Sequence, residues 1–161
     1  MIQKPDIVVL DTNVCLDLFV FYDPRWAALL AALRNGTLQA ITREDCRREW
    51  QLVLNYKHLP PSALLPATQT DFDALIPCLP MPVSECDIRL PVCSDPDDQK
   101  FLELAYQSGA QYLITKDKAL LKCAGKARRS GLFAIIPPQA WALADENKAG
   151  TTTQAGFCPL L

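Results

Sequence analysis

The chain has 161 residues, of which half are hydrophobic and 21% are charged, and this suits one globular domain with a real core. The formal net charge of −2 does not by itself indicate a nucleic-acid partner. No apolar run approaches the ~20 residues that a membrane span requires, and the first residues lack a secretory signal. We therefore expect a cytoplasmic protein without a membrane partner.

The seven cysteines form an odd number without C-x-x-C spacing, which argues against a disulfide framework. His58 is the only histidine, so a structural zinc site lacks both its pattern and its partners. Cysteines beside apolar residues are expected to be buried, and those in a proline-rich stretch to be more exposed. The first set is Cys15, Cys46 and Cys123, and the second is Cys78, Cys86 and Cys93.

The N-terminal third of the chain alternates strand and helix patterns. The β-branched run at 6–10 predicts a buried strand, and polar residues followed by apolar spacing predict a helix at 11–20. Gly36 after an asparagine is typical of a left-handed helix cap, and Thr42 with Asp45 three residues later predicts a capping box. The other elements expected here are a helix at 24–34, a strand at 37–41 and a helix at 42–56.

The rest of the chain begins with a proline-rich region at 59–96, which we expect to be mostly loop. A helix at 95–108 is predicted to end at Gly109. The other expected elements are helical turns within 62–79, strands at 87–93, 110–115 and 132–136, and a helix within 118–131. We expect one domain over residues 1–144, followed by a poorly ordered tail at 145–161.

Acidic residues fall where such a fold places its chemistry. Strands that alternate with helices predict an α/β fold with a parallel sheet covered on both faces, and ligands of such sheets bind beyond the carboxyl ends of the strands. Asp11 directly follows the first predicted strand, and Asp117 follows a later one. Asp98 and Glu49 lie on predicted helices, at positions whose spacing turns them inward.

Each of these acids also has a simpler interpretation. Asp11 and Asp117 suit the N-caps of the helices that follow them, and Asp95 before Pro96 suits the N-cap of its own helix. Glu49 would lie on the surface if its helix were phased one position differently. Capping therefore stays open for the aspartates, and exposure stays open for Glu49.

The combination of the acids points to a cation. Carboxylates that converge from separate elements raise one another's pKa values unless a cation neutralises them. The lack of histidine near these acids favours Mg²⁺ or Mn²⁺ over zinc. Two such ions roughly 3.5–4 Å apart can activate a water and stabilise the leaving oxygen of a phosphodiester.

Four acidic segments resemble the successive motifs of the PIN-domain ribonucleases. They are VVLDTNV (8–14), REWQLVL (48–54), SDPDDQKFLELA (94–105) and YLITKDKALL (112–121). The resemblance spans about residues 6–137 and is nearest to the bacterial toxins of toxin–antitoxin systems related to VapC. It implies a three-layer α/β/α sandwich with a mainly parallel sheet, cleavage of single-stranded RNA with Mg²⁺ or Mn²⁺, homo-oligomers and a cognate antitoxin.

The same resemblance implies a role for each acid. Asp11, Asp98 and Asp117 would bind the metal, and Glu49 would complete its shell or orient the attacking water, so that all four would be catalytic. Three further residues would support the site: Asn13, Thr115 and Asp95. Lys116 departs from the small residue that many relatives have before the last aspartate, so it would either pair with phosphate or crowd the pocket.

Basic and aromatic residues offer an RNA-binding surface. Clustered basic side chains are candidates to guide the RNA backbone, although a solvated helix face is the simpler alternative. They are Arg43, Arg47, Arg48, Lys116, Lys118 and Lys122. Four aromatic residues suit either core packing or stacking on unpaired bases, and these are Phe19, Phe21, Tyr22 and Trp26.

Two other classes of protein fit part of the pattern. A non-catalytic scaffold that binds RNA or protein would keep the fold without the chemistry. A receiver-type phosphoacceptor domain also binds Mg²⁺ at the ends of parallel strands, but it needs an acidic pair after its first strand. This chain has Asp11 alone at that place.

Overall fold

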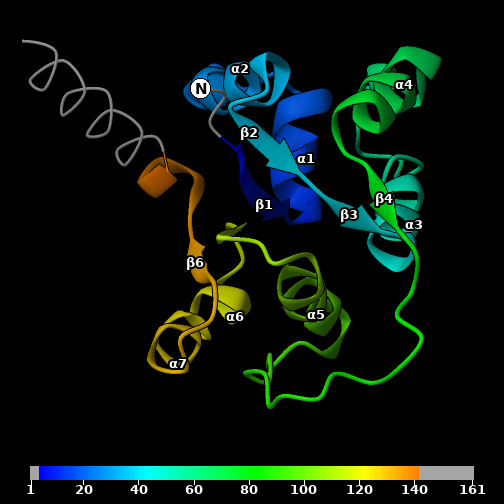
Figure 1. The fold of residues 1–161 in the computed structure, drawn as a ribbon. Coiled ribbons are helices and arrows are strands. Elements are labelled where there is room, and N and C mark those ends of the chain that lie inside the picture. The colour runs from blue at the N-terminus through cyan, green and yellow to red at the C-terminus, as the bar shows by residue number, and fades with distance from the viewer. Residues whose placement is uncertain (1–3, 142–161) are drawn as a thin grey trace, which may run out of the picture.

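The computed structural model describes residues 4–141, so the tail predicted at 145–161 and the end of the domain predicted at 1–144 lie outside the described residues. A four-stranded sheet has the order β2-β1-β5-β6, and every neighbouring pair is parallel (Figure 1). Its strands are β1 (Asp6–Leu10), β2 (Leu38–Ala40), β5 (Tyr112–Ile114) and β6 (Ala134–Ile136).

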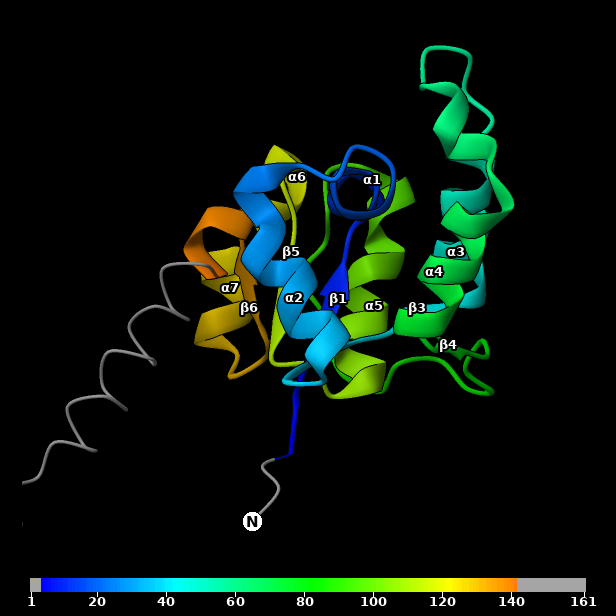
Figure 2. The same ribbon diagram turned by 90° about the horizontal axis from the view of Figure 1, so that it is seen from above.

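Helices cover both faces of the sheet, because successive side chains of a strand point to opposite sides. Val8 and Leu10 pack into one buried cluster, and Val9 between them packs into the other. The helices of the first layer are α1 (Thr12–Phe19) and α2 (Ala27–Asn35), and those of the second are α5 (Gln99–Ser108), α6 (Lys118–Leu121) and α7 (Ala124–Arg129). Figure 1 shows the sheet between them, and Figure 2, seen from above, shows α2 lying over the strands. This arrangement confirms the predicted α/β sandwich with a parallel sheet.

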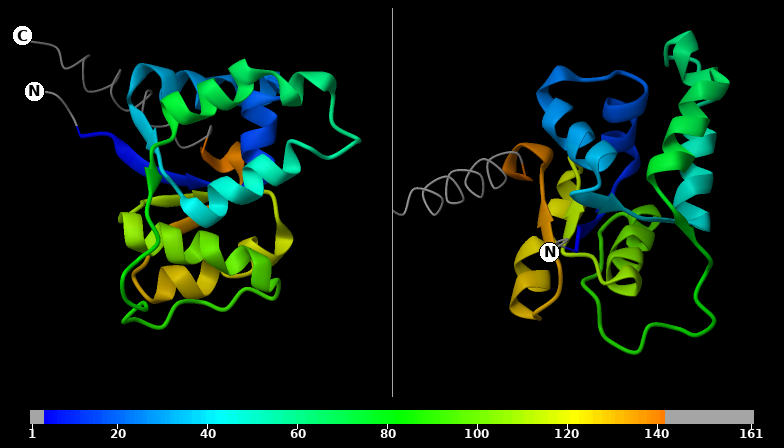
Figure 3. Two further views of the ribbon diagram at one scale, coloured as in Figure 1. Left: turned by 90° about the vertical axis from the view of Figure 1, so that its right-hand side faces the viewer. Right: turned by 45° about the horizontal axis from the view of Figure 1, so that its top comes forward.

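A helix pair stands at one flank of this sandwich. The remaining elements are β3 (Thr42–Arg43), α3 (Glu44–Val53), α4 (Pro66–Leu75), β4 (Cys78–Leu79) and three 3₁₀ turns, η1 (Pro24–Trp26), η2 (Pro61–Leu64) and η3 (Pro96–Asp98). Helices α3 and α4 lie side by side (Figure 3), with Trp50 stacked on Phe72 at 4.7 Å between ring centroids. Phe19 of α1 meets both rings edge-on, so aromatic packing fixes α3 against the sandwich.

The helix predicted at 42–56 begins later than expected. Thr42 belongs to β3, where it pairs with the parallel strand β4. The carboxylate of Asp45 accepts hydrogen bonds from the guanidinium of Arg43 rather than closing a capping box with Thr42. The helix therefore starts at Glu44, and the predicted capping box is wrong.

The proline-rich region differs from expectation in two places. Strand β4 forms where helical turns were expected. No strand forms at 87–93, a segment that the structure describes in full, because a side chain takes its backbone groups. Gln99 donates to the carbonyl of Pro91 (2.9 Å) and accepts from the N–H of Cys93 (2.8 Å). Cys93 is buried in the second apolar cluster, against the exposure expected for it.

The other expected features of the fold are present. Gly36 and Gly109 take the left-handed conformation at the ends of α2 and α5, with φ of 83° and 68°. The helix expected within 118–131 is two short helices, α6 and α7. The three cysteines predicted to be buried are buried, and Cys78 and Cys86 are exposed. Within residues 4–141, no helix is long and apolar enough to cross a membrane.

Candidate active site

Asp11 and Asp117 meet because the strands before them are neighbours. Strands β1 and β5 pair in parallel with Leu10 opposite Ile114, which brings the residues after both strands to the same edge of the sheet. The hydroxyl of Thr115 donates a hydrogen bond to Oδ2 of Asp11, and its oxygen accepts one from the N–H of Asp117 (2.9 Å). Thr115 thus links the two acids across the sheet edge.

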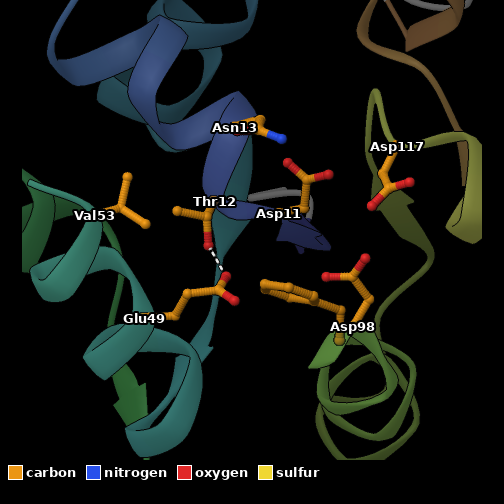
Figure 4. Close-up of a pocket in the computed structure, with 8 residues that line it drawn as sticks. Asp11, Thr12, Asn13, Glu49, Val53, Asp98 and Asp117 are labelled. Atoms are coloured by element: carbon orange, nitrogen blue, oxygen red, sulfur yellow. Dashed lines mark hydrogen bonds between the residues drawn. The ribbon is translucent and has the colours of Figure 1, made fainter. Parts of the chain in front are cut away.

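A pocket of about 160 Å³ opens at this edge. Its lining residues are Asp11, Thr12, Asn13, Glu49, Val53, Asp98, Phe101 and Asp117. The carboxylates of Asp11, Asp98 and Asp117 point toward one common space, and Glu49 faces them from α3 (Figure 4). The structure therefore brings together the four acids that the sequence singles out, although they come from separate elements.

The aspartates also cap helices, as the simpler interpretation expects. Asp11 and Asp117 cap α1 and α6, and each accepts a backbone N–H with one side-chain oxygen. Asp95 does the same at the start of η3. A carboxylate offers two oxygens with about four lone-pair sites. Capping and a place at the pocket are therefore compatible.

Asp98 differs from the other acids because one of its oxygens is buried without a hydrogen-bond partner. Its Oδ2 is buried and has no hydrogen bond to any described residue. The pKa of Asp98 is raised to about 7, most of all by burial. The hydrogen bond to Asp117 and the charge of Asp117 also raise it, followed by the charges of Asp95 and Glu49. The pKa of Asp117 is lowered in turn by its hydrogen bonds with Asp98 and with the N–H of Ala119. A buried carboxylate oxygen of this kind is costly unless a hydrogen bond or a cation satisfies it.

Three carboxylates lie close enough to share one ion. Ligand oxygens of Asp95, Asp98 and Asp117 all lie within 4.8 Å of one another. This group differs from the expected metal set, in which Asp11 was a ligand and Asp95 only supported the site. Both oxygens of Asp11 are engaged, by the hydroxyl of Thr115 and by the backbone of α1, and its burial raises its pKa in spite of these bonds.

Glu49 is held by hydrogen bonds from two other helices. The hydroxyl of Thr12 donates to its Oε2, and the ammonium of Lys100 donates to its Oε1 at 2.9 Å. Lys100 was not singled out from the sequence, although a signal existed, because it is the only basic residue of the acidic segment 94–105. Asn13 is exposed at the rim, where it lines the pocket.

Arg43 does not have the exposure that RNA contact requires. Its side chain is only 1% exposed, and its guanidinium pairs with Asp45 (2.8 Å) and Glu103 (2.9 Å). The hydrogen bonds that its guanidinium donates to Asp45 and Glu103 outweigh burial and raise its pKa above the ordinary value. A buried charge must be paired to be tolerated, so these contacts make Arg43 a structural residue. This corrects the expectation that Arg43 guides RNA.

The other five basic candidates differ in their exposure and in whether they form salt bridges. Arg47 pairs with Asp73 at 2.9 Å. Lys116 pairs with Asp17 at 2.7 Å and is not among the residues that line the pocket. Three candidates are exposed and form no salt bridge with another described residue, and these are Arg48, Lys118 and Lys122.

The four aromatic candidates also differ in their exposure to solvent. Phe19 and Trp26 are buried, so core packing accounts for them. Phe21 and Tyr22 are 50% and 52% exposed in the loop after α1. Tyr22 also has a φ of 47°, which is uncommon for a bulky residue. Stacking on bases therefore stays open for Phe21 and Tyr22 alone.

The sequence model of the PIN domain family matches residues 7–119, which hold all four acids of the pocket. The match covers well over half of the chain, and the chain therefore belongs to the PIN domain family, whose members are generally nucleases. A comparison with curated proteins finds no match. Membership of this family, together with the single acid after β1, argues against the receiver-type alternative.

Proposed function

We propose that the protein is a metal-dependent endoribonuclease that cleaves single-stranded RNA in the acidic pocket. The observation that carries the proposal is the buried, unpartnered Oδ2 of Asp98 beside the carboxylates of Asp95 and Asp117. A divalent cation at this place would satisfy that oxygen and relieve the repulsion among the three acids. Membership of the PIN domain family supports nuclease chemistry.

The residues of the pocket suit Mg²⁺ or Mn²⁺. Both are hard cations that take oxygen ligands, and Mg²⁺ typically uses one or two carboxylates together with waters and substrate phosphates. Asp95, Asp98 and Asp117 would hold the ion, and Asp11 would face it across the same space. When bound, the ion would lower the pKa of a water and offset negative charge on the phosphate.

The remaining residues would position the reactants. Glu49 is fixed by two hydrogen-bond donors on the pocket wall, where its carboxylate can accept a hydrogen bond from the attacking water and orient it. The amide of Asn13 at the rim can donate to an oxygen of the substrate. Thr115 keeps the carboxylate of Asp11 in place through its hydroxyl.

RNA would approach over the exposed cations beside the pocket. Lys118 follows Asp117 directly, Arg48 precedes Glu49, and Lys122 lies just after α6. Each phosphate that such a cation neutralises releases counterions, so RNA affinity should fall with salt. Exposed Phe21 and Tyr22 can stack on unpaired bases.

The finer part of the proposal is a biological role as the toxin of a toxin–antitoxin pair. It rests on the likeness of the four acidic motifs to those of VapC-related toxins. In this role a cognate antitoxin would block the pocket, and the substrate would be cytoplasmic RNA. The nuclease domain would extend over residues 1–144 and would form homo-oligomers. Growth arrest on expression, relieved by the product of a neighbouring gene, would support it.

The test of the nuclease proposal is cleavage of single-stranded RNA with Mg²⁺ or Mn²⁺ and then with a chelator. We expect cleavage only by the wild type with metal, and none by Asp98→Asn. The control is Asp97→Asn, which removes an exposed acid from the same turn. Metal-independent cleavage, or full activity of Asp98→Asn, would overturn the proposal. A preparation free of other proteins that cleaves no RNA would favour the non-catalytic scaffold.

A further inference from the structure

Lys100 places a positive charge in the wall of the acidic pocket. Its ammonium lies 2.9 Å from Oε1 of Glu49, and it also donates a hydrogen bond to the carbonyl of Asp97. Its side chain is 17% exposed, and that of Glu49 is 28% exposed. An ion pair shielded to this degree is screened less than one on the surface. The ammonium of Lys100 therefore offsets the negative charge that Glu49 would otherwise present to the pocket.

The two hydrogen bonds to Glu49 also fix its position. Thr12 of α1 binds one carboxylate oxygen and Lys100 of α5 binds the other. Glu49 itself belongs to α3, so three helices meet at this carboxylate. Turning Glu49 toward a cation would break at least one of these bonds and leave the ammonium of Lys100 without its partner.

The carboxylate oxygens with the fewest hydrogen-bond partners lie on one side of the pocket. Both oxygens of Asp11 accept hydrogen bonds, as do both oxygens of Glu49. The buried oxygen that has no hydrogen-bond partner belongs to Asp98, in the group that it forms with Asp95 and Asp117. One divalent ion at that group is well supplied with ligands. A second ion near Glu49 would meet an engaged carboxylate and the like charge of an ammonium.

We propose that Lys100 is a positioning residue whose ammonium holds Glu49 and takes the place of a second metal ion, so that the pocket binds one divalent ion. This inference rests on the proposed metal-dependent function. It distinguishes a one-ion pocket with a lysine from the two-ion clamp that many phosphodiester-cleaving sites use. Lys100 acts on the reaction through Glu49, which it orients and neutralises.

The number of bound ions tests the proposal directly. Mn²⁺ is titrated into the full chain at neutral pH, the bound ions are counted by calorimetry, and their spectrum is recorded by electron paramagnetic resonance. We expect one isolated Mn²⁺ per wild-type chain. We expect Lys100→Met, which frees Glu49 and adds one negative charge to the pocket, to bind two ions whose spectrum shows spin coupling. Two coupled ions in the wild type, or a single ion in a folded Lys100→Met, would overturn the proposal.

Three further variants separate the pairing from a loss of charge or of folding. Lys118→Met removes a lysine next to Asp117 without touching Glu49, and it should keep one ion. Lys100→Arg retains the cation, and Lys100→Met combined with Glu49→Gln removes both partners, so each should also bind one ion. If Lys100→Met does not fold, Lys100→Gln is measured in its place. The number of Mn²⁺ ions that the wild type binds tests the proposal without either variant. A wild type that binds no Mn²⁺ would contradict the proposed metal-dependent function instead.

Discussion

One carboxylate oxygen of Asp98, at the end of η3, lies within 4.8 Å of one of Asp117, which follows β5. Burial together with the neighbouring carboxylate of Asp117 favours the protonated form of Asp98 and raises its pKa to about 7. The ordinary pKa of an aspartate side chain is 3.8. Folding therefore favours the protonated form of this pair when no metal is bound.

The stability of the metal-free protein should depend on pH through Asp98. Between about pH 4 and pH 7, Asp98 is protonated in the native state but ionised in the unfolded state. The free energy of unfolding therefore falls as pH rises from about 4 toward 7 and then levels off. Asp98→Asn lacks this contribution. Denaturant unfolding of both proteins at pH 5, 6, 7 and 8 with chelator would measure it. Identical pH slopes for the two proteins would contradict the assignment.

Asp95 should bind the metal rather than only cap a helix. Asp95→Asn keeps the side-chain oxygen that accepts the N–H of Asp97 but removes the charge. We expect its Mn²⁺ affinity to fall by at least about 10-fold, with little change in stability. Asp97→Asn, a change of the same kind on an exposed side chain of the same turn, should bind Mn²⁺ as the wild type does. Equal affinity of Asp95→Asn and the wild type would leave Asp95 as a cap alone.

Much of the fold and the location of the pocket could be predicted from the sequence because both follow from local patterns. A short β-branched run followed by an acid places Asp11 at the end of a strand, and Asp117 comes three residues after the end of the strand Tyr112–Ile114. Parallel pairing then brings the two together, since the ends of parallel strands share an edge. The inward spacing of Asp98 and Glu49 on their helices supplied the rest.

Features that depend on contacts across the chain could not be predicted in this way. The sequence predicts a surface position for Arg43, but its partner Glu103 lies 60 residues away and only the fold brings them together. Lys100 meets Glu49 across 51 residues for the same reason. That Asp95 groups with Asp98 and Asp117 within 4.8 Å depends on how the folded chain places their side chains, and helical periodicity carries no information on this.

The hydroxyl of Thr115 should matter for both stability and activity. Thr115→Val removes the donor to buried Asp11 and the acceptor of the N–H of Asp117. A buried polar group that loses its partner costs about 1–3 kcal/mol, and we expect a loss of this size in the free energy of unfolding. The pKa of Asp11 should rise further, because Thr115 lowers it in the wild type.

Thr115→Ser keeps the hydroxyl and serves as the matched control for Thr115→Val. Both variants would be compared by denaturant unfolding and by RNA cleavage over a range of pH. We expect Thr115→Ser to stay near the wild type in both measurements. If the two variants lose stability equally, the effect belongs to the packing of the methyl group rather than to the hydrogen bonds.

Arg43 and Lys118 should separate structural cations from RNA-binding ones. Arg43→Met removes a buried guanidinium paired with Asp45 and Glu103, and we expect it to lower the free energy of unfolding by about 1–2 kcal/mol. The loss stays moderate because the two acids left behind are 30% and 43% exposed and can reach water. RNA affinity of the folded variant should be unchanged.

Lys118→Ala should show the opposite pattern, because its exposed side chain has no salt bridge with another described residue. We expect little change in stability, weaker RNA binding, and a salt dependence of log affinity that is shallower by about 0.7 for a single-stranded RNA. Fluorescence anisotropy with a labelled RNA at several salt concentrations measures both effects, with a catalytically silent Asp98→Asn background to prevent cleavage. Because one phosphate contact is lost whatever base lies beside it, the weakening should be uniform across RNA sequences. An unchanged salt dependence would mean that Lys118 does not contact an RNA phosphate and that the RNA binds along another side of the pocket.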